Sequence, residues 1–291
     1  MKKSKQTLAL LLAACMIVLW LPLSATAGFS DVSDGETARN VEVLQMMGVI
    51  SGVSYDRFEP NGTLTRAQFT KMAVTILGKA DQVGSYRSFT IFPDVKSSHW
   101  AAGYVNFSVR GEQKFISGFA DGTFGPDRNI SYGEAVTILM RLLGYKDEDV
   151  GLAWPSGYLN AAASAGLTEG LSLAGTDAIT RAQAAKLFVN LLSTLTKADK
   201  KTPFGESVSS GVQQDVILLR PNAKLDDGSL AVQTTESTTK LANGHAPTLL
   251  QGLRGTLLLD AKGNAWGFVP SRVGSAKEIT VSNRQGRQLD G

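Results

Sequence analysis

The chain has 291 residues, of which 43% are hydrophobic and 19% charged. This composition is that of a folded globular protein and excludes an intrinsically disordered one. The formal net charge of +3 comes from three lysines in the first five residues, Lys2, Lys3 and Lys5. The rest of the chain has as many acidic as basic residues, so nothing favours a nucleic-acid partner or a polybasic membrane patch.

The first 27 residues have the pattern of a secretory signal peptide. A basic start precedes an apolar run over residues 7–23, and Ala25-Thr26-Ala27 then supplies small residues for cleavage before Gly28. An uncleaved membrane anchor stays open, because a run of this length reaches the lower bound of a span. Lipidation also stays open, because Leu12-Ala13-Ala14-Cys15 resembles a bacterial lipobox. Beyond the leader the chain has no cysteine, so packing alone must stabilise it outside the cell.

The predicted mature chain contains internal repeats. The stretch Val49-Ile50-Ser51-Gly52 returns as Phe115-Ile116-Ser117-Gly118, and a looser third copy begins at Gly166-Leu167-Thr168. Because repeats of this length stack as supersecondary units, they determine the architecture. The predicted boundaries of the three repeats are residues 28–78, 91–145 and 150–194.

Each repeat is predicted to form a helix, a loop and a second helix. Apolar residues recur at spacings of 0, 3, 4, 7 and 8 after each loop, which is the pattern of a helix with one buried face. These second helices are expected over residues 69–77, 135–143 and 184–192, and shorter helices precede the loops at 101–108 and 158–165. Since one repeat cannot bury its own apolar face, we expect a mainly α fold in which the three repeats pack together.

Two of these second helices begin with the same four residues, Thr65-Arg66-Ala67-Gln68 and Thr180-Arg181-Ala182-Gln183. Threonine followed three residues later by glutamine predicts a capping box. The arginine is unexpected, because a cation at the first helical position faces the positive end of the helix dipole. One hypothesis is that Arg66 and Arg181, with free helix N–H groups, bind an anion. The alternative is that arginine is simply a good helix former with its head in water.

From about residue 195 the pattern changes. Residues 195–213 combine Lys200-Lys201-Thr202-Pro203 with a serine-rich stretch and are predicted to be a linker. Residues 214–291 are predicted to form a small β-rich module. Its expected strands are 216–219, 230–234, 256–259, 265–269 and 279–282.

The repeats resemble the S-layer homology domain of bacterial cell-surface proteins. Three groups of motifs carry the resemblance, namely Phe92-Pro93-Asp94-Val95 with His99-Trp100-Ala101, Ile116-Ser117-Gly118 with Asp121-Gly122-Thr123-Phe124 and Pro126, and Ile179-Thr180-Arg181-Ala182-Gln183. The resemblance covers about residues 29–193. It implies three repeats about a pseudo-threefold axis, with grooves between them that hold an anionic, often pyruvylated, cell-wall polysaccharide.

Carried over position by position, the resemblance implies a set of ligand-binding residues: Arg66, Arg181, Thr65, Thr180, Gln68, Gln183, Asp31, Asp94, Trp100, Gly52 and Gly118. Alternatives stay open for some of them, since the aspartates can be helix caps or Asx turns and Trp100 can be buried between helices. The middle repeat departs from the pattern, because Tyr132 stands where arginine is expected. The third repeat lacks the early aspartate, so we expect one or two working grooves.

Enzymatic chemistry has little support in the sequence. The chain has two histidines and no cysteine after the leader, so we predict no catalytic residues, no metal site and no cofactor. The leading hypothesis is a secreted, non-enzymatic protein that binds cell-wall polysaccharide at the bacterial surface, with no nucleic-acid partner and no stable membrane span after cleavage. Two alternatives stay open, a structural subunit of a surface layer and a scaffold that displays a ligand-binding β module.

Overall fold

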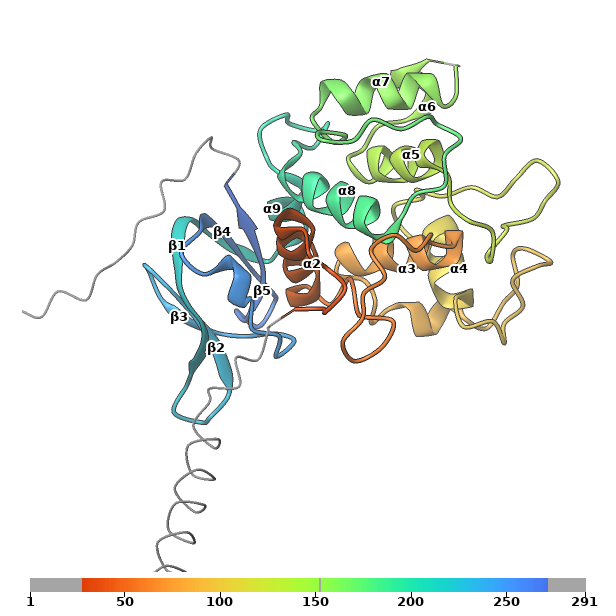
Figure 1. The fold of residues 1–291 in the computed structure, drawn as a ribbon. Helices are drawn as coiled ribbons and strands as arrows, with labels where there is room; N and C mark the ends of the chain where they lie inside the picture. Colours follow the sequence, from red (N-terminus) through yellow and green to blue (C-terminus); the bar gives the residue numbers. More distant parts are fainter. Residues whose placement is uncertain (1–27, 152, 272–291) are drawn as a thin grey trace, which may run out of the picture.

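The computed structural model describes residues 28–151 and 153–271. The predicted signal peptide and the strand expected at 279–282 lie outside these residues. The fold class is confirmed, because a bundle of three helical repeats is followed by a β module (Figure 1). Within the described residues, no helix is long and apolar enough to cross a membrane.

Each repeat contributes two main helices. The bounds are α2 Gly35–Met46 and α3 Arg66–Ile76 in the first repeat, α4 Ala102–Arg110 and α5 Tyr132–Leu142 in the second, and α7 Ser156–Ser164 and α8 Arg181–Ser193 in the third. The predicted apolar stripes are buried in one core, in which Phe69 and Phe188 meet with ring centroids 4.9 Å apart. Gly78 and Gly144, with φ of 69° and 93°, end α3 and α5 in a conformation that glycine adopts without strain.

The packing of the helices is cyclic. The second helix of each repeat packs against the first helix of the next one: α3 on α4, α5 on α7, and α8 back on α2. At the centre, three residues just before the second helices form a closed ring of backbone hydrogen bonds. Leu64 N donates to Ile179 O (3.3 Å), Ile179 N to Ile130 O (3.2 Å) and Ile130 N to Leu64 O (3.0 Å). This ring confirms the threefold arrangement of the repeats.

Short helices complete the connections. They are η1 Val83–Tyr86, α6 Asp147–Val150, α9 Phe204–Val208 and η2 Thr248–Leu250. The stretch predicted as a linker contains packed structure, since Phe204 of α9 is 1% exposed. Phe204 is flanked by polar and small residues, so the sequence around it has no apolar periodicity from which α9 could be predicted.

The β module is one antiparallel sheet with strand order β3-β2-β1-β4-β5. The strands are β1 Gly211–Lys224, β2 Leu230–Thr234, β3 Thr238–Lys240, β4 Arg254–Leu259 and β5 Ala265–Pro270. The sheet is docked on the first and third repeats, because α2 and α8 both contact β5 (Figure 1). Asn243 Nδ2 donates to Met46 O (3.1 Å), and a Cβ on Gly267 would lie 2.9 Å from Met47.

Candidate functional site: the helix starts and the groove at Arg66

All three second helices begin with a capping box. Thr65 Oγ1 accepts from Gln68 N (3.2 Å) while Gln68 Oε1 accepts from Thr65 N (2.9 Å). Thr180 and Gln183 repeat this pair of bonds, and so do Ser131 and Glu134 in the middle repeat. These threonines and glutamines therefore hold the helix starts in place. Their contact with a ligand stays a prediction.

The N–H groups at the helix starts are already used between the repeats. Arg66 N donates to Arg128 O (2.8 Å) and Ala67 N to Pro126 O (3.0 Å). In the third repeat Arg181 N donates to Gly62 O (2.8 Å). The expectation of free N–H groups beside the arginines is therefore wrong, because the loop of a neighbouring repeat supplies the acceptors.

The side chain of Arg66 joins the first repeat to the second. It is 5% exposed, and its guanidinium donates from Nε to Phe124 O (3.0 Å) and from Nη2 to Ser117 O (2.7 Å). The group also lies over the rings of Phe119 and Phe124, 4.8 and 4.9 Å from their centroids. Burial lowers the pKa of Arg66 from its usual range, yet an arginine remains charged at neutral pH. Among the described residues, none accepts a hydrogen bond from Nη1.

Arg181 makes the same connection from the third repeat to the first. Its Nε donates to Phe58 O (2.6 Å) and its Nη2 to Ser51 O (2.8 Å), with the guanidinium 4.4 Å from the centroid of the Phe58 ring. Burial lowers its pKa, while the nearby carboxylates of Glu59 and Asp31 act in the opposite direction. Both arginines are therefore partly occupied by internal carbonyl groups.

The second repeat contacts the third through a tyrosine instead of an arginine. Tyr132 is 4% exposed. Its side chain interacts with that of Thr168 in the third repeat, and its backbone N donates to Asp177 O (2.8 Å) of the same repeat. Thr168 follows Leu167 as Ser117 follows Ile116, so the partner occupies the corresponding loop position. Each repeat thus reaches the loop of the next one through the first residue of its second helix.

The two predicted aspartates fasten the loop of their own repeat. Asp31 accepts from Phe58 N (2.9 Å) and Glu59 N (2.8 Å), and these bonds hold the pKa of Asp31 below its usual range. Asp94 accepts from Phe124 N (3.0 Å) and Gly125 N (2.7 Å) in the same way. Neither of them caps the helix that follows it, since the N-cap of α2 is Asp34 and that of α4 is Ala101.

The two predicted glycines have a packing role. A Cβ on Gly52 would lie 2.4 Å from Phe29, and one on Gly118 would lie 2.3 Å from Phe92. Both phenylalanines come two residues before the aspartates just described. These glycines are therefore needed where an aromatic ring crosses the loop, and a role against a ligand stays a prediction.

A groove opens beside Arg66, where the second repeat meets Arg66 of the first repeat and Trp154 of the third. Its volume is about 200 Å³, and its floor includes Arg66, the loop at Ser117 and the α5 residues Glu134 and Arg141. Trp154, 57% exposed, forms one wall.

Three side-chain contacts set the charge and the rigidity of this groove. Trp154 Nε1 donates to Thr137 Oγ1 (3.0 Å), which orients the indole. Glu134 is paired with Arg128, and Arg141 Nη2 donates to Asp147 (2.9 Å), a residue with a 68% exposed side chain. The groove therefore places the guanidinium groups of Arg66 and Arg141, the second of them paired with Asp147, beside an aromatic surface.

Sequence reasoning missed Trp154 and Arg141. Trp154 stands at the start of the third repeat as Trp100 stands at the start of the second, and this parallel was the available signal. Trp100 is 48% exposed, so the alternative of a buried tryptophan is wrong. Its role as the aromatic wall of a groove with Arg181 stays a prediction.

The junction between the second and third repeats, beside Tyr132, differs from the groove at Arg66 in the side chains that occupy it. Lys186 of α8 forms an ion pair with Glu36 of α2, and the Lys186 ammonium lies 2.8 Å from the place of a Cβ on Gly170. Among the described residues, no group of histidines, cysteines or carboxylates could hold a metal ion.

The fold and the groove define a threefold repeat protein with an opening of about 200 Å³ beside Arg66. The family model of the S-layer homology domain matches residues 28–70, 91–136 and 146–185. Residues 28–185 therefore belong to the S-layer homology family, in three tandem copies.

Similar proteins come from bacterial surfaces. The chain is 29% identical over 243 residues to a cell surface protein of Thermoanaerobacter kivui, covering 80% of this chain and 31% of the relative. It is 26% identical over 189 residues to a middle cell wall protein of Brevibacillus brevis, covering 64% and 17%. A cellulosome-anchoring protein of Acetivibrio thermocellus is 34% identical over 86 residues, covering 30% and 19%. The chain spans less than a third of the length of each of these relatives.

Proposed function

We propose that this chain anchors an exported protein to the bacterial cell wall without a covalent bond and without catalysis. Its ligand is an anionic secondary cell-wall polysaccharide, and the groove at Arg66 receives an acidic group of that polymer, for which a pyruvyl ketal is one candidate. The family and the relatives, named as cell surface, cell wall and anchoring proteins, indicate a secreted protein of the cell wall or cell surface.

The observation that carries this proposal is the arrangement of charge around the groove. Arg66 is fixed by two carbonyl groups and keeps Nη1 for a further acceptor. Fixing a guanidinium in advance lowers the entropy lost when a ligand binds. Trp154 adds a flat apolar surface for a sugar ring, which a carboxylate-binding arginine alone would not offer.

A wall-binding assay tests the proposal. Purified cell walls should retain the parent chain, and walls stripped of their secondary polymer by acid extraction should not. Trp154→Ala should weaken retention about tenfold, because an aromatic contact is lost while the packed core is untouched. The matched control is Tyr55→Ala, since Tyr55 is fully exposed and lies outside the groove.

Two results would contradict the proposal. One is equal retention by extracted and intact walls, which would show that the secondary polymer is not the ligand. The other is parent-like retention of Trp154→Ala, which would move the site elsewhere. Ordered self-assembly of the chain without any polymer would instead favour the surface-layer subunit.

A further inference from the structure

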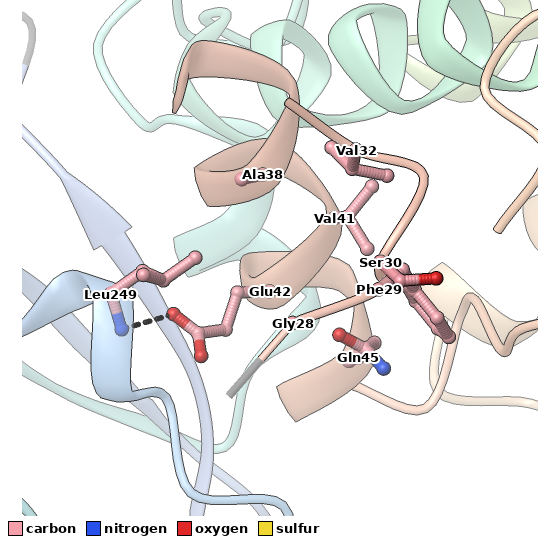
Figure 2. Close-up of a pocket in the computed structure, with 9 residues that line it drawn as sticks. All are labelled: Gly28, Phe29, Ser30, Val32, Ala38, Val41, Glu42, Gln45 and Leu249. Carbon is pink, nitrogen blue, oxygen red and sulfur yellow. Dashed lines mark hydrogen bonds between the residues drawn. The ribbon is translucent and has the colours of Figure 1, made fainter. Parts of the chain in front are cut away.

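A second cavity is lined by α2, by residues 28–32 just before it, and by Leu249 of the β module (Figure 2). Its volume is about 500 Å³, and its lining is mostly apolar, with Phe29, Val41 and Leu249 among the residues. The cavity is separate from the groove at Arg66, since the two share no residue. Neither the family match nor the proposed wall binding assigns a role to it.

The cavity contains a buried carboxylate, Glu42 of α2. Glu42 is 2% exposed, and its side chain accepts from Leu249 N (2.5 Å) and from Thr248 Oγ1 (3.1 Å) of the β module. Figure 2 shows the carboxylate of Glu42 directed at Leu249. Burial raises the pKa of Glu42 to about 7, and the two hydrogen bonds act in the opposite direction.

No side-chain cation compensates this carboxylate. Among the described residues, no lysine, arginine or histidine forms an ion pair with Glu42, and it is the only titratable side chain among the residues that line the cavity. The cations on adjoining helices lie elsewhere, since Arg39 Nη1 is 3.6 Å from the Cβ position of Gly35 at the start of α2 and Lys186 of α8 pairs with Glu36. The other acidic group near the start of the chain, Asp31, accepts from the loop at Phe58. A buried carboxylate without a cation is costly, so the site calls for a positive charge.

The start of the described chain lies in the same cavity. Gly28 lines it together with Glu42 (Figure 2). The next residues are held firmly, because Phe29 stacks on Phe58 with centroids 5.6 Å apart and Ser30 N donates to Asp56 O (2.8 Å). The sequence predicts cleavage directly before Gly28, and cleavage there would convert a neutral amide into an α-ammonium group.

We propose that the α-ammonium group of Gly28, produced when the leader is removed, occupies this cavity and pairs with Glu42. Export then completes the contact between the first repeat and the β module, because the cation appears only in the processed chain. The uncleaved precursor lacks that cation, so its Glu42 stays uncompensated and the same contact is weaker. This inference rests on the predicted cleavage and is independent of wall binding.

The test compares two processed chains, residues 28–291 and residues 26–291. They differ by Thr26 and Ala27, so only the first has its α-amine at Gly28. The pKa of Glu42, followed by carboxyl carbon NMR, should be lower by about 1 or more in the chain that begins at Gly28, because an opposite charge nearby favours the carboxylate. The melting temperature at pH 7 should be higher by about 2–4 °C in that chain. Mass spectrometry of the exported protein should show Gly28 as its first residue.

Two variants make the comparison specific. Glu42→Gln should abolish the difference in melting temperature between the two chains, whereas Glu36→Gln, on the same helix but exposed, should preserve it. Equal pKa values of Glu42 in the two parent chains would overturn the proposal, and this result does not depend on how well Glu42→Gln folds. A different first residue in the exported protein, or a temperature difference that persists in Glu42→Gln, would overturn it as well.

The melting temperatures of the two chains should also depend differently on pH. A carboxyl group whose pKa is raised by folding stabilises the folded state below its unfolded pKa, about 4.5, and this contribution is lost as the pH rises through the folded value. The chain 26–291 should therefore lose melting temperature between about pH 4.5 and pH 7. The chain 28–291 should lose less over this range, and equal losses would contradict the pairing.

Discussion

The groove at Arg66 and the corresponding position at Tyr132 are built from the same parts and differ in charge. Both helix starts have a capping box, and both first residues hydrogen-bond the loop of the next repeat, Arg66 through Nη2 and Tyr132 through its backbone N. At Arg66 the space beside the contact is open and lined by Trp154. Beside Tyr132 the α8 position that corresponds to Thr137 is Lys186, whose ammonium pairs with Glu36.

This difference separates assembly from ligand binding. Tyr132 stands where the second repeat joins the third, so this junction forms without a positive charge at the first helical position. A charge that this junction does without, beside an open aromatic groove, supports a role in binding an anion. The following substitutions test both halves of this interpretation.

The largest effect is expected from Arg66→Ala. It leaves two carbonyl groups, Ser117 O and Phe124 O, without their donor, and each buried acceptor without a partner costs on the order of 1–3 kcal/mol. Urea unfolding should show a loss of about 2–4 kcal/mol, with a smaller loss for the more exposed Arg181→Ala. The control is Arg39→Ala, which changes an exposed arginine of α2. Equal losses of unfolding free energy for the Arg66 and Arg39 variants would show that the bonds from Arg66 to the second repeat do not stabilise the fold.

A smaller loss is expected from Gly118→Ala. The added methyl group would lie 2.3 Å from Phe92 Cε1, so the ring or the loop must shift at a cost of about 1–3 kcal/mol. Gly84→Ala is the matched control, because nothing lies within 4 Å of its Cβ position and the change should stay within about 0.5 kcal/mol. Thermal unfolding of both variants decides whether Gly118 serves packing, and an unchanged Gly118→Ala would point to another role.

The smallest effect is expected from a substitution at Lys186, beside Tyr132. Lys186→Ala removes a largely surface ion pair with Glu36, so the free energy of unfolding should fall by about 0.2–1 kcal/mol. Retention on cell walls should not increase, since the opened space beside Tyr132 would contain no arginine. An increase in retention would show that an arginine is not needed for binding at such a position.

The local elements could be predicted from sequence, and the connections between repeats could not. Capping boxes and apolar stripes depend on neighbours within eight residues, so Thr65, Gln68 and the faces of α3, α5 and α8 followed directly from spacing. The acceptors of Arg181 lie 123 and 130 residues away in the chain. No local pattern encodes such a contact, and for this reason free N–H groups were wrongly expected at the helix starts.

The same limit explains the residues that were missed. Trp154 lines the groove only because the third repeat packs against α5. Glu42 is buried only because the β module packs against α2. Strand β3 was not among the predicted strands, because its three residues are too few to show an alternating pattern.

The most direct test of the central claim follows the indole N–H signals of Trp154, Trp100 and Trp266 by NMR while purified secondary cell-wall polymer is added. The account predicts a saturable change at Trp154, little change at Trp266 in the β module, and loss of the Trp154 response when the acidic groups of the polymer are removed. Binding of the intact polymer with no change at Trp154 would contradict it.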